Sequence, residues 1–198
     1  WVCAECLAAT RPFDLPACLR CGAIEIASCE CDVLPDVLQS IRAAYPFAGW
    51  VRESIHDFKF RREFGRCDYL AQTIVDHVPL AGIDLLVPVP IHRERLRERG
   101  FNQSMLLARA ISKQTGIPAQ ANAIERTVKR LPQVGRSMQD RWLAVAGVFA
   151  IPHPDLVRAR HIAIVDDVIT TGATVTECAR VLIAAGAASV RAIAIARG

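Results

Sequence analysis

The sequence is poor in aromatic residues and contains no apolar run long enough to cross a membrane. Aromatic residues make up 6% of its 198 residues, which argues against a large aromatic-lined ligand cavity. Its stretches without charge or proline fall well short of the roughly 20 residues that a membrane helix needs. The first residues do not form a secretory signal, so we expect a cytoplasmic protein with no membrane insertion. Since the chain begins at Trp1 rather than Met, we also expect upstream residues to be missing from it.

The sequence does have enough apolar residues to build a core. Hydrophobic residues make up 52% of the chain and charged residues 22%, with a mean hydropathy of +0.24. A chain of this composition buries a real core, which excludes disorder as its main state. Its length suits one well-packed domain plus a small module, or two small domains.

The net charge of +4 hides an uneven distribution along the chain. Residues 1–41 carry a net charge of −4, residues 42–141 a net charge of +7, and residues 142–198 a net charge of +1. A basic middle suits a polyanionic partner, either a small phosphorylated ligand or a nucleic-acid backbone. The alternative for scattered Lys and Arg residues is a solvated surface, and the scatter favours it.

Cysteine is concentrated at the front, with six of the eight residues inside the first 31. These six form close pairs: Cys3 and Cys6, Cys18 and Cys21, Cys29 and Cys31. Close pairs of thiolates are typical of zinc, which takes four tetrahedral ligands at about 2.3 Å. The alternative is a disulfide framework, which needs an oxidising compartment. Because no secretory signal is present, we expect zinc.

The sequence leaves the choice of zinc ligands open. The four cysteines between residues 18 and 31 form a compact local set. Cys3 and Cys6 could instead join Cys18 and Cys21, or a pair upstream of Trp1. Six thiolates for one ion leave two without a role.

Patterning divides the chain into three parts. Residues 1–35 resemble a zinc-ribbon-like module that folds only with its ion. Residues 36–79 predict a helical lead-in, read as helices or as helix plus strand. Residues 80–198 alternate strands and helices, which predicts an α/β fold with a mainly parallel sheet and helices on both faces. The expected strands are 83–89, 119–125, 147–151, 161–165 and 190–196, and the expected helices are 101–114 and 174–185.

Residues 162–174 carry the strongest functional signal. A buried strand ends at Asp166 and Asp167, and a Thr/Gly turn then opens a helix. The turn consists of Thr170, Thr171, Gly172, Ala173 and Thr174. Free backbone N–H groups and hydroxyls at a helix start can bind one phosphate. The adjacent carboxylates can bind paired hydroxyls or a Mg²⁺ ion, so the segment predicts a phosphorylated-sugar site. A threonine helix cap is the alternative, but it does not explain two adjacent acids.

This segment resembles the phosphoribosyl pyrophosphate loop of type I phosphoribosyltransferases. Further motifs occur in the order seen in the ComF family, that of competence protein F and its relatives. They are the cysteine pairs, Val87-Pro-Val-Pro90, Arg99-Gly-Phe-Asn-Gln103, Pro132-Gln133 and the loop at 166–174. The resemblance covers essentially the whole chain. It implies a type I phosphoribosyltransferase fold behind the zinc module.

The resemblance also implies roles for individual residues. Asp166 and Asp167 would contact the ribose hydroxyls and position the substrate, and residues 170–174 would bind its 5′-phosphate. The turn after Pro90 matches the pyrophosphate loop, and residues 126–141 match a mobile loop that closes over the reaction. The candidate ligand contacts in and near these two segments are Arg93, Arg99, Asn102, Gln103 and Arg136. For any one arginine, a solvated helix start is an equal alternative.

Three functional hypotheses follow. The first is a Mg²⁺-dependent phosphoribosyltransferase with an unknown acceptor. The second, implied by the ComF resemblance, is a competence factor in DNA uptake that binds single-stranded DNA and works with a helicase-like protein. The third is a sensor of phosphoribosyl pyrophosphate without turnover. An aromatic and basic cluster around Trp50, Phe58 and Phe60 gives weak support to DNA binding, and core packing is the favoured reading of it.

Overall fold

A four-stranded parallel sheet forms the centre of the molecule. The computed structural model describes residues 2–13, 18, 20–23, 29, 31, 36–60, 64–127 and 145–198. The strands, in their order across the sheet, are β1 (Ser40–Pro46), β6 (Ser189–Arg197), β5 (His161–Ile169) and β2 (Leu85–Pro88). The parallel α/β class that the sequence predicted is confirmed.

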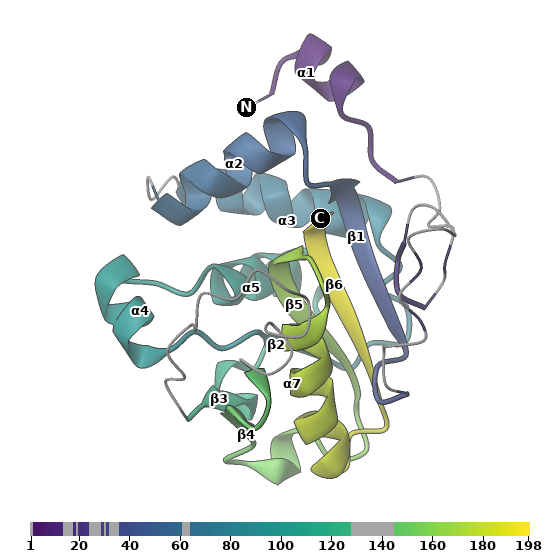
Figure 1. The fold of residues 1–198 in the computed structure, drawn as a ribbon, viewed down its shortest axis with the longest axis vertical. Coiled ribbons are helices and arrows are strands. Elements are labelled where there is room, and N and C mark those ends of the chain that lie inside the picture. Colours follow the sequence, from purple (N-terminus) through teal and green to yellow (C-terminus); the bar gives the residue numbers. More distant parts are fainter. Residues whose placement is uncertain are drawn as a thin grey trace.

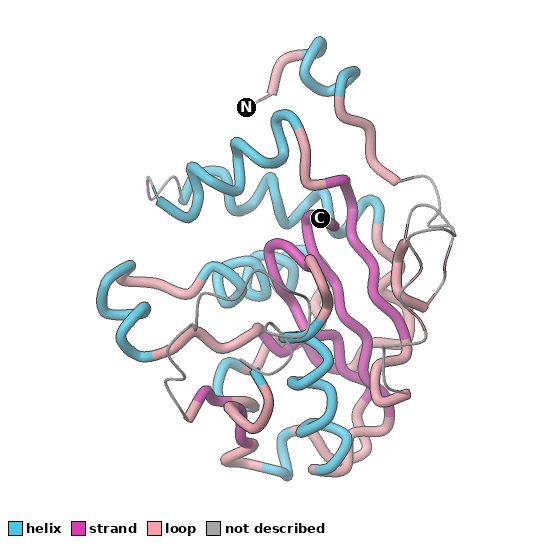
Figure 2. The backbone as a smooth tube through the Cα atoms, in the orientation of Figure 1, coloured by secondary structure: helices cyan, strands magenta, loops and turns pink. Residues whose placement is uncertain are grey.

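Helices cover both faces of this sheet (Figures 1 and 2). One apolar core packs the sheet against α7 (Ala173–Ala184). The other packs the opposite face against α2 (Gly49–Phe60), α3 (Cys67–His77) and α5 (Gln103–Thr115). β5 contributes to both cores, with Ile162 and Ile164 on one face and Ala163 and Val165 on the other. Burial on both faces explains why this strand is a continuous apolar run.

The remaining elements are short. They are α1 (Ala4–Ala9), α4 (Arg93–Arg99), the antiparallel pair β3 (Glu125–Arg126) and β4 (Phe149–Ala150), and three 3₁₀ turns at Phe64–Arg66, Ala121–Ala123 and Pro154–Leu156. In the described part of the chain, no helix combines the length and apolarity that a membrane crossing requires.

Strand β1 lies inside the segment 36–79, which the sequence predicted as a helical lead-in. It pairs with β6 from Ser40 opposite Arg191 to Pro46 opposite Arg197. The segment therefore contributes an edge strand to the sheet as well as helices α2 and α3. The pairing partner lies about 150 residues away in the sequence, so local periodicity could not reveal the strand. The boundaries at 35/36 and 79/80 stay predictions.

Two of the expected strands are much shorter than their apolar patterns suggested. Residues 119–125 contain one bridge from Ala119 to Leu86, a 3₁₀ turn and the first residue of β3. Residues 147–151 contain only the two residues of β4. Both segments pack against the sheet through buried side chains such as Ile124 and Phe149. Burial without a long hydrogen-bonded partner strand accounts for the strand-like composition.

Strand β5 runs past the point where the sequence predicted its end. It continues through both aspartates to Ile169, because β6 is long enough to pair with it as far as Arg197. β2 pairs with β5 only as far as Pro88 opposite Val165. Asp166 therefore lies just beyond the last residue of β5 that has a neighbour on both sides. The result is a notch at the carboxyl end of the sheet, the edge where parallel sheets bind ligands.

Candidate functional site

A cleft opens at this notch, and it brings together residues from five parts of the chain, Arg126 of β3 among them. It has a volume of about 180 Å³. Both aspartates line it, together with the start of α5, the segment after β2 and the end of α2. The described lining residues are Lys59, Val89, Pro90, Ile91, His92, Arg95, Arg99, Asn102, Gln103, Ser104, Arg126, Asp166 and Asp167.

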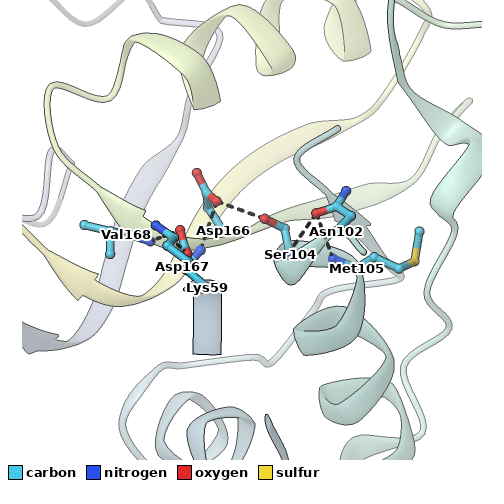
Figure 3. Close-up of polar contacts among 7 residues, drawn as sticks. All are labelled: Lys59, Asn102, Ser104, Met105, Asp166, Asp167 and Val168. Carbon is cyan, nitrogen blue, oxygen red and sulfur yellow. Dashed lines mark hydrogen bonds and ion pairs between the residues drawn. The ribbon is translucent and has the colours of Figure 1, made fainter. Parts of the chain in front are cut away.

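Asp166 is held from two sides through one of its oxygens (Figure 3). Its Oδ1 accepts a hydrogen bond from the Ser104 hydroxyl at 2.9 Å and another from the backbone N–H of Asp167 at 2.9 Å. Burial, and then the negative charge of Asp167, raise the pKa of Asp166 to about 7, although the Ser104 bond acts to lower it. The other carboxylate oxygen makes no hydrogen bond within the described residues, which leaves it available to a ligand.

Asp167 is fully engaged within the protein. Its Oδ1 accepts from the backbone N–H of Val168 at 2.8 Å. Its Oδ2 forms an ion pair with Nζ of Lys59 at 2.6 Å (Figure 3). The Asp167 side chain is only 8% exposed, so this pair sits at the floor of the cleft. Sequence reasoning did not assign Lys59 to the site, because nothing in the local sequence of α2 points to strand β5.

The turn after β5 forms the second part of the site. Residues 168–175 line a hollow of about 40 Å³ together with Asp166. Gly172, at a φ of 75°, is the N-cap of the twelve-residue helix α7, and no side chain caps this helix. The threonine-cap alternative is therefore wrong. The N–H groups at this helix start remain open to an anion, and glycine supplies the left-handed conformation that the turn needs.

The predicted polar residues after β2 divide into those that line the cleft and those that do not. Arg99, Asn102 and Gln103 line it, and Arg93 does not. Asn102 caps α5 through its Oδ1 and donates from Nδ2 to the Val89 carbonyl at 3.0 Å, so it also fixes the local backbone. Gln103 is 4% exposed, and its Nε2 has no hydrogen-bond partner within the described residues. Arg136 lies outside the described residues.

Comparison with known proteins gives a consistent result. No family model matches the chain. The chain is 32% identical to the DNA utilization protein YhgH of Escherichia coli K12, over 99% of this chain and 90% of that protein. It is 30% identical to competence protein F of Haemophilus influenzae, over 72% of this chain and 66% of that protein. The chain belongs to the ComF family.

Other comparisons extend this picture. Competence protein ComFC of Bacillus subtilis is 27% identical to this ComF-family chain, over 99% of the chain and 84% of that protein. Solved structures similar to the chain include a glutamine phosphoribosylpyrophosphate amidotransferase from B. subtilis, at 24% identity and a TM-score of 0.42. That match covers 66% of this chain and 25% of the amidotransferase. A hypoxanthine-guanine phosphoribosyltransferase from L. donovani matches at 17% identity and a TM-score of 0.34, over 66% of this chain and 67% of that one.

A larger cavity of about 680 Å³ adjoins the cleft of this ComF-family protein. The two share Lys59 and Arg99 as lining residues. The cavity runs along α2, and its wall includes Phe47 and Phe60. The low aromatic content predicted no large aromatic-lined cavity. The chain has a large cavity, but only two of its nine described lining residues are phenylalanines.

Four of the six front cysteines come together in this ComF-family protein. The sulfur atoms of Cys18, Cys21, Cys29 and Cys31 all lie within 4.8 Å of one another. Tetrahedral zinc at about 2.3 Å from each sulfur needs sulfur–sulfur distances of about 3.8 Å. Cys18 and Cys31 are 3.2 Å apart and Cys21 and Cys29 are 3.7 Å apart, so the cluster is compatible with zinc.

Without an ion, the electrostatics of the cluster favour the thiolate form at Cys18 and disfavour it at Cys31. Backbone N–H groups of Cys21 and Arg20 lower the pKa of the Cys18 thiol to about 6. Hydrogen bonding with Cys18, followed by burial, raises the pKa of Cys31 to about 12. A divalent cation at the centre would stabilise all the thiolates together. Cys3 and Cys6 lie apart from the cluster, at the start of the exposed helix α1.

Proposed function

We propose that this ComF-family protein binds phosphoribosyl pyrophosphate together with Mg²⁺ at the cleft. The observation that carries the proposal is the position of Asp166, which lines both the cleft and the hollow formed by residues 168–175. A phosphate in the turn places an attached ribose beside this carboxylate. Arg95, Arg99 and Arg126 line the other side, where a pyrophosphate group would need cations.

Each group of residues then has a distinct task. Backbone N–H groups at the start of α7 bind the 5′-phosphate. Asp166 accepts a hydrogen bond from a ribose hydroxyl, and Ser104 orients its carboxyl group. The arginines stabilise negative charge that grows on a departing pyrophosphate. Mg²⁺, when bound with the ligand, supplies further neutralisation of that charge.

Transfer of the phosphoribosyl group requires an acceptor, and the larger cavity beside the cleft is where we place it. Its volume is within the range that holds drug-sized ligands. An occupant there would lie next to Lys59 and Arg99, at the border with the ribose. Without an acceptor, the same cleft would act as a sensor of its ligand, as the sequence also allowed.

Calorimetric titration tests the binding proposal directly. Phosphoribosyl pyrophosphate with Mg²⁺ is titrated into the wild type, into a double variant Asp166→Asn/Asp167→Asn and into the control Asp155→Asn. Asp155 is an exposed carboxylate that lines neither the cleft nor the hollow of residues 168–175. We expect binding to the wild type and control, and a loss of at least about tenfold in the double variant. No binding to folded wild type would contradict the proposal.

A role in DNA utilization is the second candidate function, in keeping with the names of the relatives. It has one structural observation in its favour. Phe64, 46% exposed, and Phe101 line a hollow of about 390 Å³ together with the cations Arg109 and Lys113 and with Asp68. Aromatic rings next to cations are the usual platform for single-stranded nucleic acid. Trp50 and Phe58, from the aromatic cluster noted in the sequence, are buried in the core instead, and only Phe60 of that cluster is exposed.

Binding of a fluorescent oligothymidine at several salt concentrations tests this second function. We expect Phe64→Ala and Arg109→Ala to weaken binding, and affinity to fall steadily as salt rises. Equal affinity in both variants and the wild type would contradict it. A helicase-like partner, a cytoplasmic location and bound zinc in the cysteine cluster complete the proposal, the last supported by the sulfur geometry.

A further inference from the structure

The ion pair between Lys59 and Asp167 joins two distant parts of the chain inside the cleft. Lys59 is the second-last residue of α2, and Asp167 lies near the carboxyl end of β5. Their side chains are 25% and 8% exposed, so solvent screens this 2.6 Å contact only weakly. Among the described residues, Lys59 and Arg99 are also the two that border both the cleft and the larger cavity.

This pair makes the two adjacent aspartates chemically different. With Lys59 in place, Asp167 has a hydrogen bond on one oxygen and an ion pair on the other, whereas Asp166 has one oxygen without a hydrogen bond among the described residues. A protein site for a hard divalent cation such as Mg²⁺ needs several oxygen ligands with net negative charge. Here two carboxylates face four described cations of the lining: Lys59, Arg95, Arg99 and Arg126. With this excess of positive charge in its lining, the cleft disfavours a bare cation and favours a polyanion.

We propose that Lys59 sets the ligand class of the cleft: by neutralising Asp167, it prevents the aspartate pair from binding a free divalent cation and reserves the cleft for an anion that brings its own Mg²⁺. Lys59 is a positioning residue in this scheme, since it acts through Asp167. The anion half of the proposal rests on the proposed binding of phosphoribosyl pyrophosphate. The cation half stands on the geometry of the aspartate pair alone.

A merely structural role for the pair makes a different prediction. If Lys59 only ties α2 to β5, its removal lowers stability without changing which ions bind. If Lys59 masks Asp167, its removal exposes two adjacent carboxylates of one charge. Those carboxylates then relieve their mutual repulsion by taking up a proton or a cation. Gain of cation binding is therefore the readout that separates the two roles.

The experiment compares Lys59→Met, Lys59→Arg and a matched control, Arg52→Met. Arg52 lies on the same helix and borders the larger cavity, but it does not line the cleft. Mn²⁺, which accepts the same oxygen ligands as Mg²⁺, is added without any phosphate ligand, and its free concentration is read from its paramagnetic resonance signal. Circular dichroism at the working temperature verifies that each variant is folded.

We expect Lys59→Met to bind Mn²⁺ at least about tenfold more tightly than the wild type, Lys59→Arg and Arg52→Met. Adding Asp166→Asn and Asp167→Asn to Lys59→Met should abolish the gain. In calorimetry, Lys59→Met should lose at least about tenfold in affinity for phosphoribosyl pyrophosphate with Mg²⁺, while Lys59→Arg should remain close to the wild type.

Each other outcome has a definite meaning. Tight Mn²⁺ binding by the wild type, or no gain in folded Lys59→Met, overturns the masking role. A gain of Mn²⁺ binding with no affinity of the wild type for phosphoribosyl pyrophosphate supports the masking role and overturns the proposed ligand. Unchanged affinity of Lys59→Met for phosphoribosyl pyrophosphate overturns the anion half. If Lys59→Met does not fold, Lys59→Gln carries the same comparison.

Discussion

The hydroxyl of Ser104 lies 2.9 Å from Oδ1 of Asp166, and this hydrogen bond ties the first turn of α5 to the carboxyl end of β5. Ser104 is 5% exposed, so water cannot replace it easily. The bond also opposes the burial and charge effects that raise the pKa of Asp166. One buried hydroxyl thus orients the carboxylate that we assign to the ribose and partly offsets the rise of its pKa.

Replacing Ser104 by alanine should therefore affect both binding and ionisation. We expect Ser104→Ala to cost about 1 kcal/mol of unfolding free energy, since a buried acceptor loses one donor. It should also raise the pKa of Asp166, so ligand binding should require a higher pH. Calorimetry at several pH values measures the shift, and chemical denaturation measures the stability. Ser104→Thr, which keeps the hydroxyl, serves as control, and a pH profile identical to that of the wild type would contradict the assignment.

The raised pKa of Asp166 predicts a pH-dependent contribution to stability. Burial holds this pKa at about 7, above the ordinary value of 3.8. The folded state therefore binds the proton more tightly than the unfolded chain does. The contribution to stability is complete below about pH 4 and is lost as the pH rises through about 7.

The asparagine in Asp166→Asn does not titrate, so this variant does not lose the corresponding stability as the pH rises. Between pH 4 and pH 8 we expect the variant to gain about 1–3 kcal/mol of unfolding free energy relative to the wild type. Urea denaturation at each pH measures the difference. The control Asp155→Asn, at an exposed carboxylate, should show none, and equal slopes for Asp166→Asn and wild type would mean that Asp166 ionises normally.

The cysteine cluster predicts which thiols hold a metal. We expect one zinc ion per chain in protein purified under reducing conditions, measured by elemental analysis. Cys18→Ser or Cys31→Ser should lose it, because each removes one of four converging sulfurs. Cys3→Ser and Cys6→Ser should keep it. Loss of zinc in the latter pair of variants would assign the ion to the other cysteine combination.

Gly22, next to Cys21, lies so close to β1 that a larger residue there should be costly. It has a φ of 71°, and a Cβ atom there would lie 2.7 Å from the carbonyl oxygen of Ile41. We expect Gly22→Ala to destabilise the protein by about 2 kcal/mol or more, from strain plus this clash. Gly116, with a φ of 78° and open space around its Cα, is the matched control. Thermal denaturation should show a clearly larger loss for Gly22→Ala than for Gly116→Ala.

Local features of the site could be predicted from the sequence, and non-local ones could not. The aspartates and the Thr/Gly turn are contiguous, and the cysteine set spans only residues 18–31, so spacing was informative. Lys59 comes from helix α2, more than 100 residues before Asp167 in the sequence, and no local pattern predicts such a contact. The sequence left a strand open within residues 36–79 but could not place β1, since its partner β6 lies about 150 residues away.

The arginines of α4 illustrate an intermediate case. Arginine occupies every second position from 93 to 99. From the sequence alone, each of them was as good a candidate for ligand contact as for a solvated helix surface. In a helix, residues four apart share a face. Arg95 and Arg99 are such a pair and line the cleft, whereas Arg93 and Arg97 do not line it. If the segment had been known to be helical, and one of the two arginines known to line the cleft, the four-residue spacing would have identified the pair Arg95 and Arg99.

The place of β6 between β1 and β5 has a consequence for how the protein is made. During synthesis, β1 emerges first and the β2–β5 pair follows. The sheet joins these two parts only through β6, so they stay separate until residues 189–197 are available. The part of β5 that carries the aspartates has only β6 as its partner, with Asp166 opposite Ala194. A ribosome-bound chain that stops short of β6 therefore exposes two apolar strand edges and lacks a formed cleft. The cleft at the aspartates is thus a feature that the fold acquires only once β6 is in place.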